Sequence, residues 1–163
     1  GTEFLVLCPP TVYGPGDTFS EDGHVLAAMI RKCHEARVTG APEVVLWGSG
    51  RQRRQFLYVE DLAGAAVEIM QSPAFRAWSP LLNVAGHPAR RLDDVAESVA
   101  DVVGYTGRIR WDTTKAEGVP RKELLGGWAL PVLPTLLRVG VKQTYEWYIN
   151  RAVTVSGHHV ERT

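Results

Sequence analysis

The sequence predicts an α/β fold, because short apolar runs typical of strands alternate along the chain with longer segments of helical periodicity. The clearest strand is Phe4–Cys8, an apolar run that stops at two consecutive prolines. The clearest helix follows, with apolar residues from Val25 to Cys33 at spacings of three and four. The same order returns later, where a strand over Leu81–Val84 precedes a helix over Arg91–Val103.

The segment between the first strand and the first helix predicts a loop. Thr11–Gly23 contains three glycines, one proline and three acidic residues. Asp22 is the candidate N-cap of the helix that follows, and basic residues gather toward the C-terminal end of that helix. Both features favour a helix that begins close to residue 25.

Two strands are expected on either side of the turn WGSG, over Val44–Trp47 and Gln55–Val59. Glu60 and Asp61 then open a second helix, which we expect to reach Gln71. Acidic residues in a first turn stabilise a helix, because they lie at the positive end of its dipole.

The second half of the chain predicts its elements in the same way. Gly104 is placed to cap the helix that ends at Val103, and Arg108–Trp111 predicts a strand. A polar loop is expected over Asp112–Leu125. The last helix carries the aromatic residues of TYEWY, and we expect residues 151–163 to form a frayed tail.

Composition sets limits on function. The chain has 163 residues, of which 45% are hydrophobic and 22% charged, as in one ordinary globular domain. Eighteen basic residues balance eighteen acidic ones, so we expect neither nucleic acid nor an anionic membrane as partner. Cys8 and Cys33 form no disulfide framework and have no metal-ligand spacing, which favours reduced thiols, no metal and a cytoplasmic location.

The first residues lack an initiator Met and the features of a signal peptide, and no stretch approaches the roughly 18–20 apolar residues of a membrane span. Because GTEFLVLCPP already has the pattern of a buried strand, we expect the chain to be a fragment that begins within a fold.

Three features of the sequence suggest chemistry. Arg51, Arg53 and Arg54 follow the Gly-Ser-Gly turn, and their mutual repulsion has to be offset by solvent or by an anion. His24, at a helix start, is either a hydrogen-bonded structural residue or a proton donor and acceptor. The stretch PPTVYGPGD breaks into a turn at a strand end, which is where open α/β sheets bind ligands. The sequence contains no Gly-x-Ser-x-Gly elbow, P-loop or His-Glu-x-x-His motif.

Taken together and in order, these stretches resemble the C-terminal part of extended short-chain dehydrogenase/reductases that act on nucleotide sugars, in the branch of the GDP-L-fucose synthases. The family's Pro-Thr-Asn-Leu-Tyr-Gly-Pro, Ser-His-Val-Ile-Pro-Ala-Leu and Ala-Pro-x-Val-Val-x-Trp-Gly-Ser-Gly are similar to PPTVYGP, GHVLAAM and APEVVLWGSG. REFLYVDDLA is similar to RQFLYVEDLA, INVG to LNVAG and KPDGTPRK to KAEGVPRK. The resemblance spans about residues 1–150.

The resemblance implies an enzyme that converts GDP-4-keto-6-deoxymannose to GDP-L-fucose, by epimerisation at C3 and C5 and NADPH-dependent reduction at C4, acting as a homodimer. Residues 1–23 would be the end of the Rossmann side with its active-site loop, 24–150 the nucleotide-sugar-binding domain and 151–163 the tail. The family's N-terminal Rossmann part, with its Gly-x-x-Gly-x-x-Gly fingerprint, is missing from this sequence, and so is the Tyr-x-x-x-Lys pair. We therefore expect the chain alone to be inactive.

The resemblance also assigns substrate-binding residues. Trp47 and Arg54 fall where the family binds the GDP-sugar, with the arginine on phosphate. A guanidinium fork suits a pyrophosphate, and the Gly-Ser-Gly turn gives access to the backbone. Lys32 falls where the family has an arginine on the substrate, and Glu117 where it has an aspartate. Arg51 and Arg53 have no implied role.

Pro9, Pro10, Thr11 and Val12 fall where the family lines the nicotinamide of NADP. His24 falls on the active-site histidine, beside the cofactor, which with a cysteine exchanges protons at the sugar carbons that are epimerised. An imidazole suits this work, because its ordinary pKa lies near neutrality.

Several positions depart from the family pattern. Thr11 replaces an asparagine, Lys32 lacks the bidentate fork and Glu117 is one methylene longer. Residues 123–141 lack the family's regular pattern, and neither cysteine matches the epimerase cysteine. Two alternatives stay open: another nucleotide-sugar epimerase or dehydratase, and a non-catalytic nucleotide-sugar-binding or subunit-interaction remnant.

Overall fold

The computed structural model describes residues 4–20, 23–73, 81–115, 117–124, 128–129 and 134–157. The described helices are α1 (Val25–Thr39), α2 (Val59–Gln71), α3 (Leu92–Val103) and α4 (Leu137–Gly157). The described strands are β1 (Val6–Cys8), β2 (Thr11–Tyr13), β3 (Glu43–Trp47), β4 (Arg53–Arg54), β5 (Phe56–Tyr58), β6 (Leu81–Ala85), β7 (Arg90–Arg91), β8 (Arg108–Asp112), β9 (Arg121–Lys122) and β10 (Trp128–Ala129). This alternation confirms the α/β class.

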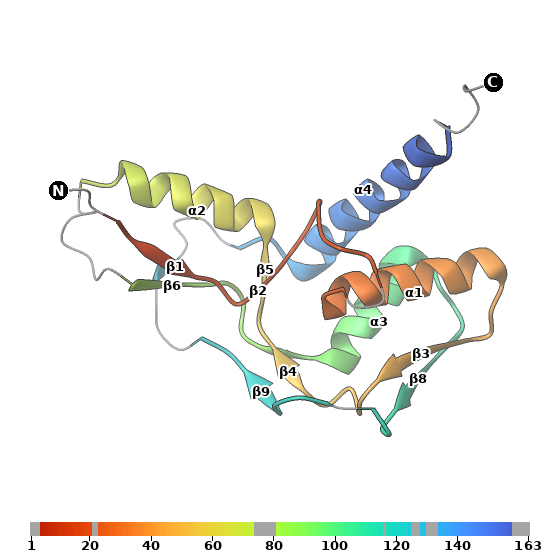
Figure 1. The fold of residues 1–163 in the computed structure, drawn as a ribbon. Helices are drawn as coiled ribbons and strands as arrows, with labels where there is room; N and C mark the ends of the chain where they lie inside the picture. The colour runs from red at the N-terminus through yellow and green to blue at the C-terminus, as the bar shows by residue number, and fades with distance from the viewer. Residues whose placement is uncertain are drawn as a thin grey trace.

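The elements form two groups, which Figure 1 shows at opposite ends of the molecule. At one end, α2 runs alongside β1 and β6, which pair in parallel, and β10 continues that sheet. At the other end, α1 packs on α3 and on β3, and β3 pairs in parallel with β8. The parallel register places Trp47, the last residue of β3, opposite Asp112, the last residue of β8.

Two short strands lie in segments where the sequence predicted loops. Thr11–Tyr13 forms β2, which pairs in parallel with β5, and Arg121–Lys122 forms β9, which pairs in parallel with β4. Strands of two or three residues are too short to show an alternating pattern, and their partners lie far away in the sequence. The loop predictions were wrong at these positions for that reason.

The predicted helices are confirmed, with small changes at their ends. Helix α3 ends at Val103 and is capped by Gly104, as expected from the sequence. The candidate cap Asp22 lies outside the described residues, and the N-cap position of α1 is His24. Helix α4 continues to Gly157, and residues 158–163 of the predicted tail lie outside the described residues.

The main hydrophobic core lies between α1, α3, α4 and the inner faces of the strands. Its fully buried side chains include Leu26, Ile30, Val95, Val99 and Val141. A smaller cluster of Leu57, Ala65 and Val84 holds α2 against β5 and β6. The two clusters fix the starts of α1 and α2 relative to the strand ends that precede them.

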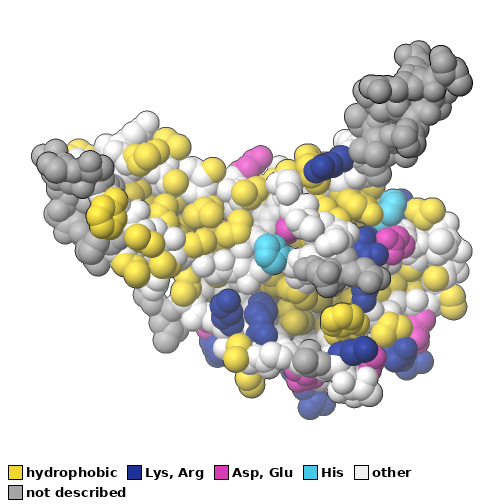
Figure 2. Space-filling model, viewed as in Figure 1, with side chains coloured by type: hydrophobic (Ala, Val, Ile, Leu, Met, Phe, Trp, Pro, Cys, Tyr) yellow, Lys and Arg dark blue, Asp and Glu magenta, His cyan; other side chains and the backbone are white. Residues whose placement is uncertain are grey.

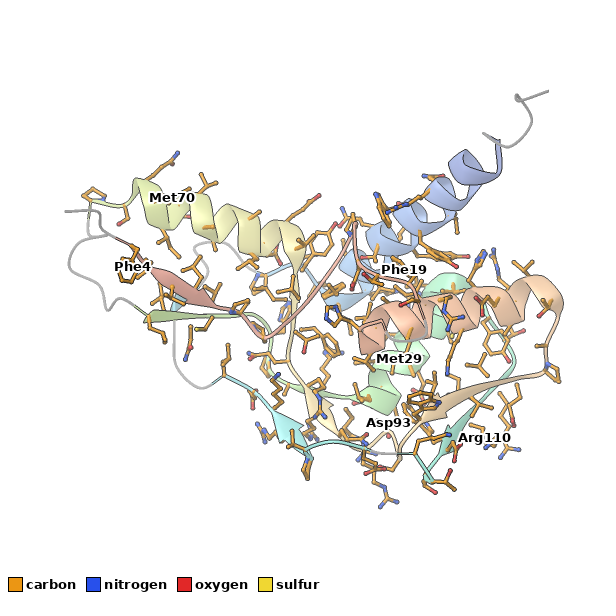
Figure 3. The ribbon with its side chains drawn as sticks, viewed as in Figure 1. Phe4, Phe19, Met29, Met70, Asp93 and Arg110 are labelled. Carbon is orange, nitrogen blue, oxygen red and sulfur yellow. The ribbon has the colours of Figure 1, made fainter. Side chains whose placement is uncertain are left out.

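Apolar side chains are exposed at the end of the molecule formed by α2, β1 and β6, where Figure 2 shows hydrophobic side chains gathered. Phe4 and Met70, labelled in Figure 3, are 75% and 68% exposed. Val6 and Leu81 are exposed as well and are register partners. Such a face is typical of surfaces that pack on other protein or promote aggregation. None of the helices within the described ranges is long and apolar enough to cross a membrane.

Candidate functional site

A pocket of about 430 Å³ opens between the first turns of α1 and the carboxyl ends of β3 and β8. Its wall is formed by Gly23, Val25, Ala28, Met29, Arg31, Lys32, Leu46, Trp47 and Trp111. Met29, a buried residue of α1, is labelled in Figure 3. The carboxyl ends of parallel strands are the usual ligand edge of open α/β sheets. The fold therefore brings Lys32 and Trp47, which are 15 residues apart in the sequence, into one pocket.

Trp47 is 58% exposed at the mouth of this pocket, although a tryptophan is ordinarily well buried. Two ammonium groups lie near its ring: Lys32 Nζ is 5.6 Å and Lys115 Nζ 5.7 Å from the ring centroid. Lys32 also donates a hydrogen bond of 2.9 Å to the carbonyl oxygen of Val45, which fixes its position. An exposed aromatic face with cations beside it suits a ligand that combines a planar base with phosphates.

Lys115 was not singled out from the sequence. It belongs to the stretch KAEGVPRK, so a signal was present, but only the chain reversal after β8 brings it to Trp47. Asp112 shapes this reversal by accepting hydrogen bonds from the backbone N–H and the hydroxyl group of Thr114.

The motif that contains Glu117 packs directly on the motif that follows Trp47. The backbone N–H of Arg53 donates to Pro120 O at 2.8 Å, and that of Gln55 to Lys122 O at 3.3 Å. Figure 1 shows the resulting pair of strands, β4 and β9. Two sequence segments that are more than 60 residues apart therefore form one surface.

Glycines make this close approach possible. Gly48 has φ of +86°, and a Cβ there would lie 3.3 Å from Glu117 Cγ. Gly50 has φ of +75°, and a Cβ there would lie 2.6 Å from the ring of Trp111. Only glycine fits both the backbone conformation and the space at these positions. The turn therefore lets Glu117 lie against the residue that follows Trp47.

Arg54 lies on the same surface but is not part of the pocket wall. It is half-buried, its Nη1 donates to Arg53 O at 2.9 Å, and its Nη2 faces Gly118. No carboxylate of the described residues is within ion-pair distance of its guanidinium. Arg51 is exposed, and Arg53 donates to Ala89 O at 3.4 Å. Arg54 is thus held by one hydrogen bond, and its guanidinium has no described carboxylate as a partner.

His24 occupies the N-cap position of α1, between the pocket residues Gly23 and Val25. Its side chain is 69% exposed, and its Nδ1 lies 3.1 Å from Asp17 Oδ1. The imidazole makes no side-chain capping bond to the helix. It is therefore free of a helix-capping role and lies next to the pocket.

The predicted cofactor-contacting residues lie apart from the pocket. Pro9, Pro10, Thr11 and Val12 are half-buried and follow the carboxyl end of β1. The backbone N–H of Thr11 is used in a hydrogen bond of 3.2 Å to Gln55 O. Proline has no backbone N–H group, so Pro9 and Pro10 make this strand end apolar.

The Cys33 thiol is not an activated nucleophile. Burial raises the pKa of the Cys33 thiol to about 11, so this group stays protonated near neutrality. Within the described residues there is also no group of three or more His, Cys, Asp or Glu side chains that could hold a metal ion.

The chain is similar to known proteins in sequence and in fold. The model of the NAD dependent epimerase/dehydratase family matches residues 1–85. GDP-L-fucose synthase 1 of Arabidopsis thaliana is 41% identical over 158 residues, which cover 91% of this chain and 46% of that protein. GDP-L-fucose synthase of Escherichia coli is 36% identical over 163 residues, covering 91% of this chain and 50% of that protein.

Among solved structures, a GDP-L-fucose synthetase from Naegleria fowleri bound to NADP matches with a TM-score of 0.79 at 27% identity. The match covers 93% of this chain and 48% of that chain. This chain spans about half the length of the curated relatives that it matches.

Proposed function

Because this chain belongs to the NAD dependent epimerase/dehydratase family, we propose that it is the substrate-binding portion of a GDP-L-fucose synthase-like enzyme. The reaction would convert GDP-4-keto-6-deoxymannose to GDP-L-fucose by epimerisation at C3 and C5 and reduction at C4. The proposal includes a homodimeric, cytoplasmic enzyme that uses NADP. By themselves the 163 residues contain neither a Gly-x-x-Gly-x-x-Gly sequence nor a Tyr-x-x-x-Lys pair, so we expect no NADPH oxidation by this chain alone.

The observation that carries the proposal is the exposed ring of Trp47 at the pocket mouth, with Lys32 and Lys115 beside it. A guanine base can stack on such a ring, and ammonium groups nearby can neutralise phosphate oxygens. Arg54, unpaired among the described carboxylates, adds a fork that suits the diphosphate. The hydrogen-bonded contact between β4 and β9 places Glu117 on the same surface, next to Gly48.

The position of His24 supports the epimerisation step. Carbons C3 and C5 flank the C4 ketone, so a proton lost from either leaves an enolate. An exposed imidazole next to the pocket can take that proton or return it. Because Cys33 is buried and protonated, we expect no proton exchange from that thiol.

NADP fits the apolar surface formed by Pro9 and Pro10, with Thr11 and Val12 in β2 behind it. When bound, NADPH supplies the hydride for reduction at C4. These four residues would line one face of the nicotinamide and exclude water from it.

Three positions leave a related substrate as the second candidate. Lys32 carries a point charge where the family's arginine would bind the substrate through two parallel hydrogen bonds, and the Glu117 side chain is one methylene longer than an aspartate. Thr11, part of β2, presents a hydroxyl group in place of an amide. If these differences select a different base or sugar, the protein is a portion of another nucleotide-sugar epimerase.

Titration of the 163-residue chain with GDP-mannose, UDP-glucose and dTDP-glucose by calorimetry tests the proposal. We expect GDP-mannose to bind most tightly, and Trp47→Ala to weaken its binding by about 5- to 150-fold, since stacking on an aromatic side chain contributes about 1–3 kcal/mol per base. Tighter binding of UDP-glucose or dTDP-glucose would favour the second candidate. Equal binding of GDP-mannose to wild type and Trp47→Ala would contradict the role of Trp47 in binding, on which the proposal rests.

A further inference from the structure

A buried carboxylate lies directly behind the exposed imidazole of His24. Asp17 Oδ1 is 3.1 Å from His24 Nδ1, and the Asp17 side chain is only 6% exposed. The same oxygen accepts a hydrogen bond of 2.7 Å from the backbone N–H of Thr18. The second oxygen, Oδ2, is buried and has no hydrogen-bond partner among the described residues. A buried carboxylate with so few donors attracts the imidazole N–H strongly.

This contact selects one tautomer of the ring. An ionised carboxylate can only accept hydrogen bonds, so His24 Nδ1 has to carry a proton and donate it to Asp17. In the neutral ring, the lone pair is then on Nε2. Nε2 lies across the ring from Asp17, on a side chain that is 69% exposed. The Asp17–His24 pair therefore presents a basic nitrogen to the space beside the pocket.

Two local hydrogen bonds and one tertiary contact hold the segments that carry the pair. The backbone N–H of Asp17 donates to Gly14 O at 3.2 Å, and that of Ala28 to His24 O at 2.9 Å. Phe19, labelled in Figure 3, stacks on Tyr148 of α4 with ring centroids 4.5 Å apart. The loop that carries Asp17 is thus packed on α4, and His24 is fixed by α1. Preorganised partners of this kind do not have to be ordered during a reaction.

We propose that Asp17 is a positioning residue, which holds His24 in the Nδ1–H tautomer so that Nε2 exchanges protons with the substrate. The inference rests on the proposed function for its substrate. In the step, neutral Nε2 takes the proton from C3 or C5, the C–H electron pair passes into the enolate of the C4 ketone, and the ring becomes an imidazolium. The reverse step returns a proton from Nε2 to carbon and restores the Nδ1–H tautomer that Asp17 stabilises.

Nuclear magnetic resonance of the 163-residue chain labelled with ¹⁵N-histidine tests the tautomer. Long-range ¹H–¹⁵N correlations should show neutral His24 mainly as Nδ1–H. Asp17→Asn keeps an acceptor oxygen but removes the charge, so the ratio of Nδ1–H to Nε2–H should fall about five- to tenfold. Asp93→Asn is the matched control, because Asp93 also accepts from the next backbone N–H but faces Arg91.

If Asp17→Asn does not fold, Asp17→Glu and Asp17→Gln repeat the comparison of charge at equal length. Glu should keep the Nδ1–H tautomer and Gln should lose it. An unchanged tautomer ratio in a folded Asp17→Asn or Asp17→Gln protein would overturn the positioning role.

A second measurement separates this inference from the proposed function. In an active enzyme that includes this chain, the Asp17→Asn variant should incorporate solvent deuterium at C3 and C5 at least about tenfold more slowly than wild type. The reason is that the Nδ1–H tautomer of His24 is depleted. Asp93→Asn should exchange at the wild-type rate. A changed tautomer with unchanged exchange would contradict the role of His24 in epimerisation, and with it that part of the proposed function.

Discussion

Replacement of Arg54 by alanine should weaken the binding of a GDP-sugar without unfolding the protein. The side chain is half-buried, it donates a hydrogen bond to the neighbouring Arg53 O, and no described carboxylate pairs with it. A charge-assisted hydrogen bond contributes about 1.5–3 kcal/mol, which corresponds to a loss of roughly 10- to 150-fold in affinity. The free energy of unfolding should change by less than about 1 kcal/mol, because no buried partner loses its hydrogen bond.

The assay is calorimetric titration of wild type, Arg54→Ala, Arg54→Lys and Arg51→Ala with GDP-mannose. Arg54→Lys should lie between wild type and alanine, since lysine keeps the charge but loses the fork. Arg51→Ala is the matched control, because Arg51 is exposed beside the same turn and its guanidinium makes no hydrogen bond to the described residues. Equal losses in Arg54→Ala and Arg51→Ala would show a general charge effect and refute the assignment of Arg54 to phosphate.

Three further predictions concern stability and reactivity. Gly140→Ala in α4 should lower the free energy of unfolding by about 1–3 kcal/mol, because the new Cβ would lie 2.3 Å from the hydroxyl oxygen of buried Tyr13. Gly64→Ala in α2, where a Cβ meets nothing within 4 Å, should instead raise the free energy of unfolding by up to about 1 kcal/mol. Urea titration of the two variants and the wild type measures both changes. Cys33, buried and with its pKa raised to about 11, should resist maleimide at pH 7.5 in the folded chain and react on unfolding in urea; rapid labelling without denaturant would contradict this burial. Burial and the Arg37 charge lower the pKa of His34 in the folded protein, so the unfolded chain binds a proton at His34 more readily. The free energy of unfolding should therefore decline as the pH falls below about 6.5. Unfolding curves recorded over a pH series should show a smaller decline for His34→Gln.

Local sequence patterns were sufficient to predict the helices. The apolar spacing from Val25 to Cys33 and the glycine at 104 act within one element, so no distant residue is needed to interpret them. Candidate substrate-binding residues were named as well, through a resemblance that rests on whole motifs. The structure places Lys32 and Trp47 in one pocket and Glu117 against Gly48; the roles of these residues remain predictions.

Long-range contacts could not be predicted in this way. Strand β2 forms because β5 offers a backbone partner, and β9 forms because β4 does. Strands this short carry no periodic pattern in the sequence. The same applies to the site. Lys115 lies near Trp47 because the parallel pairing of β3 with β8 brings the ends of these strands together, and the loop that carries Asp17 packs on α4 through Phe19 and Tyr148.

The sequence by itself thus determined the class of fold, the helices and the motifs that could bind a nucleotide sugar, since each depends on residues that are neighbours along the chain. The tertiary structure decided which side chains meet. The pairing of Asp17 with His24 is a contact between a loop and a helix start, and its chemistry depends on burial, which is a property of the packed chain.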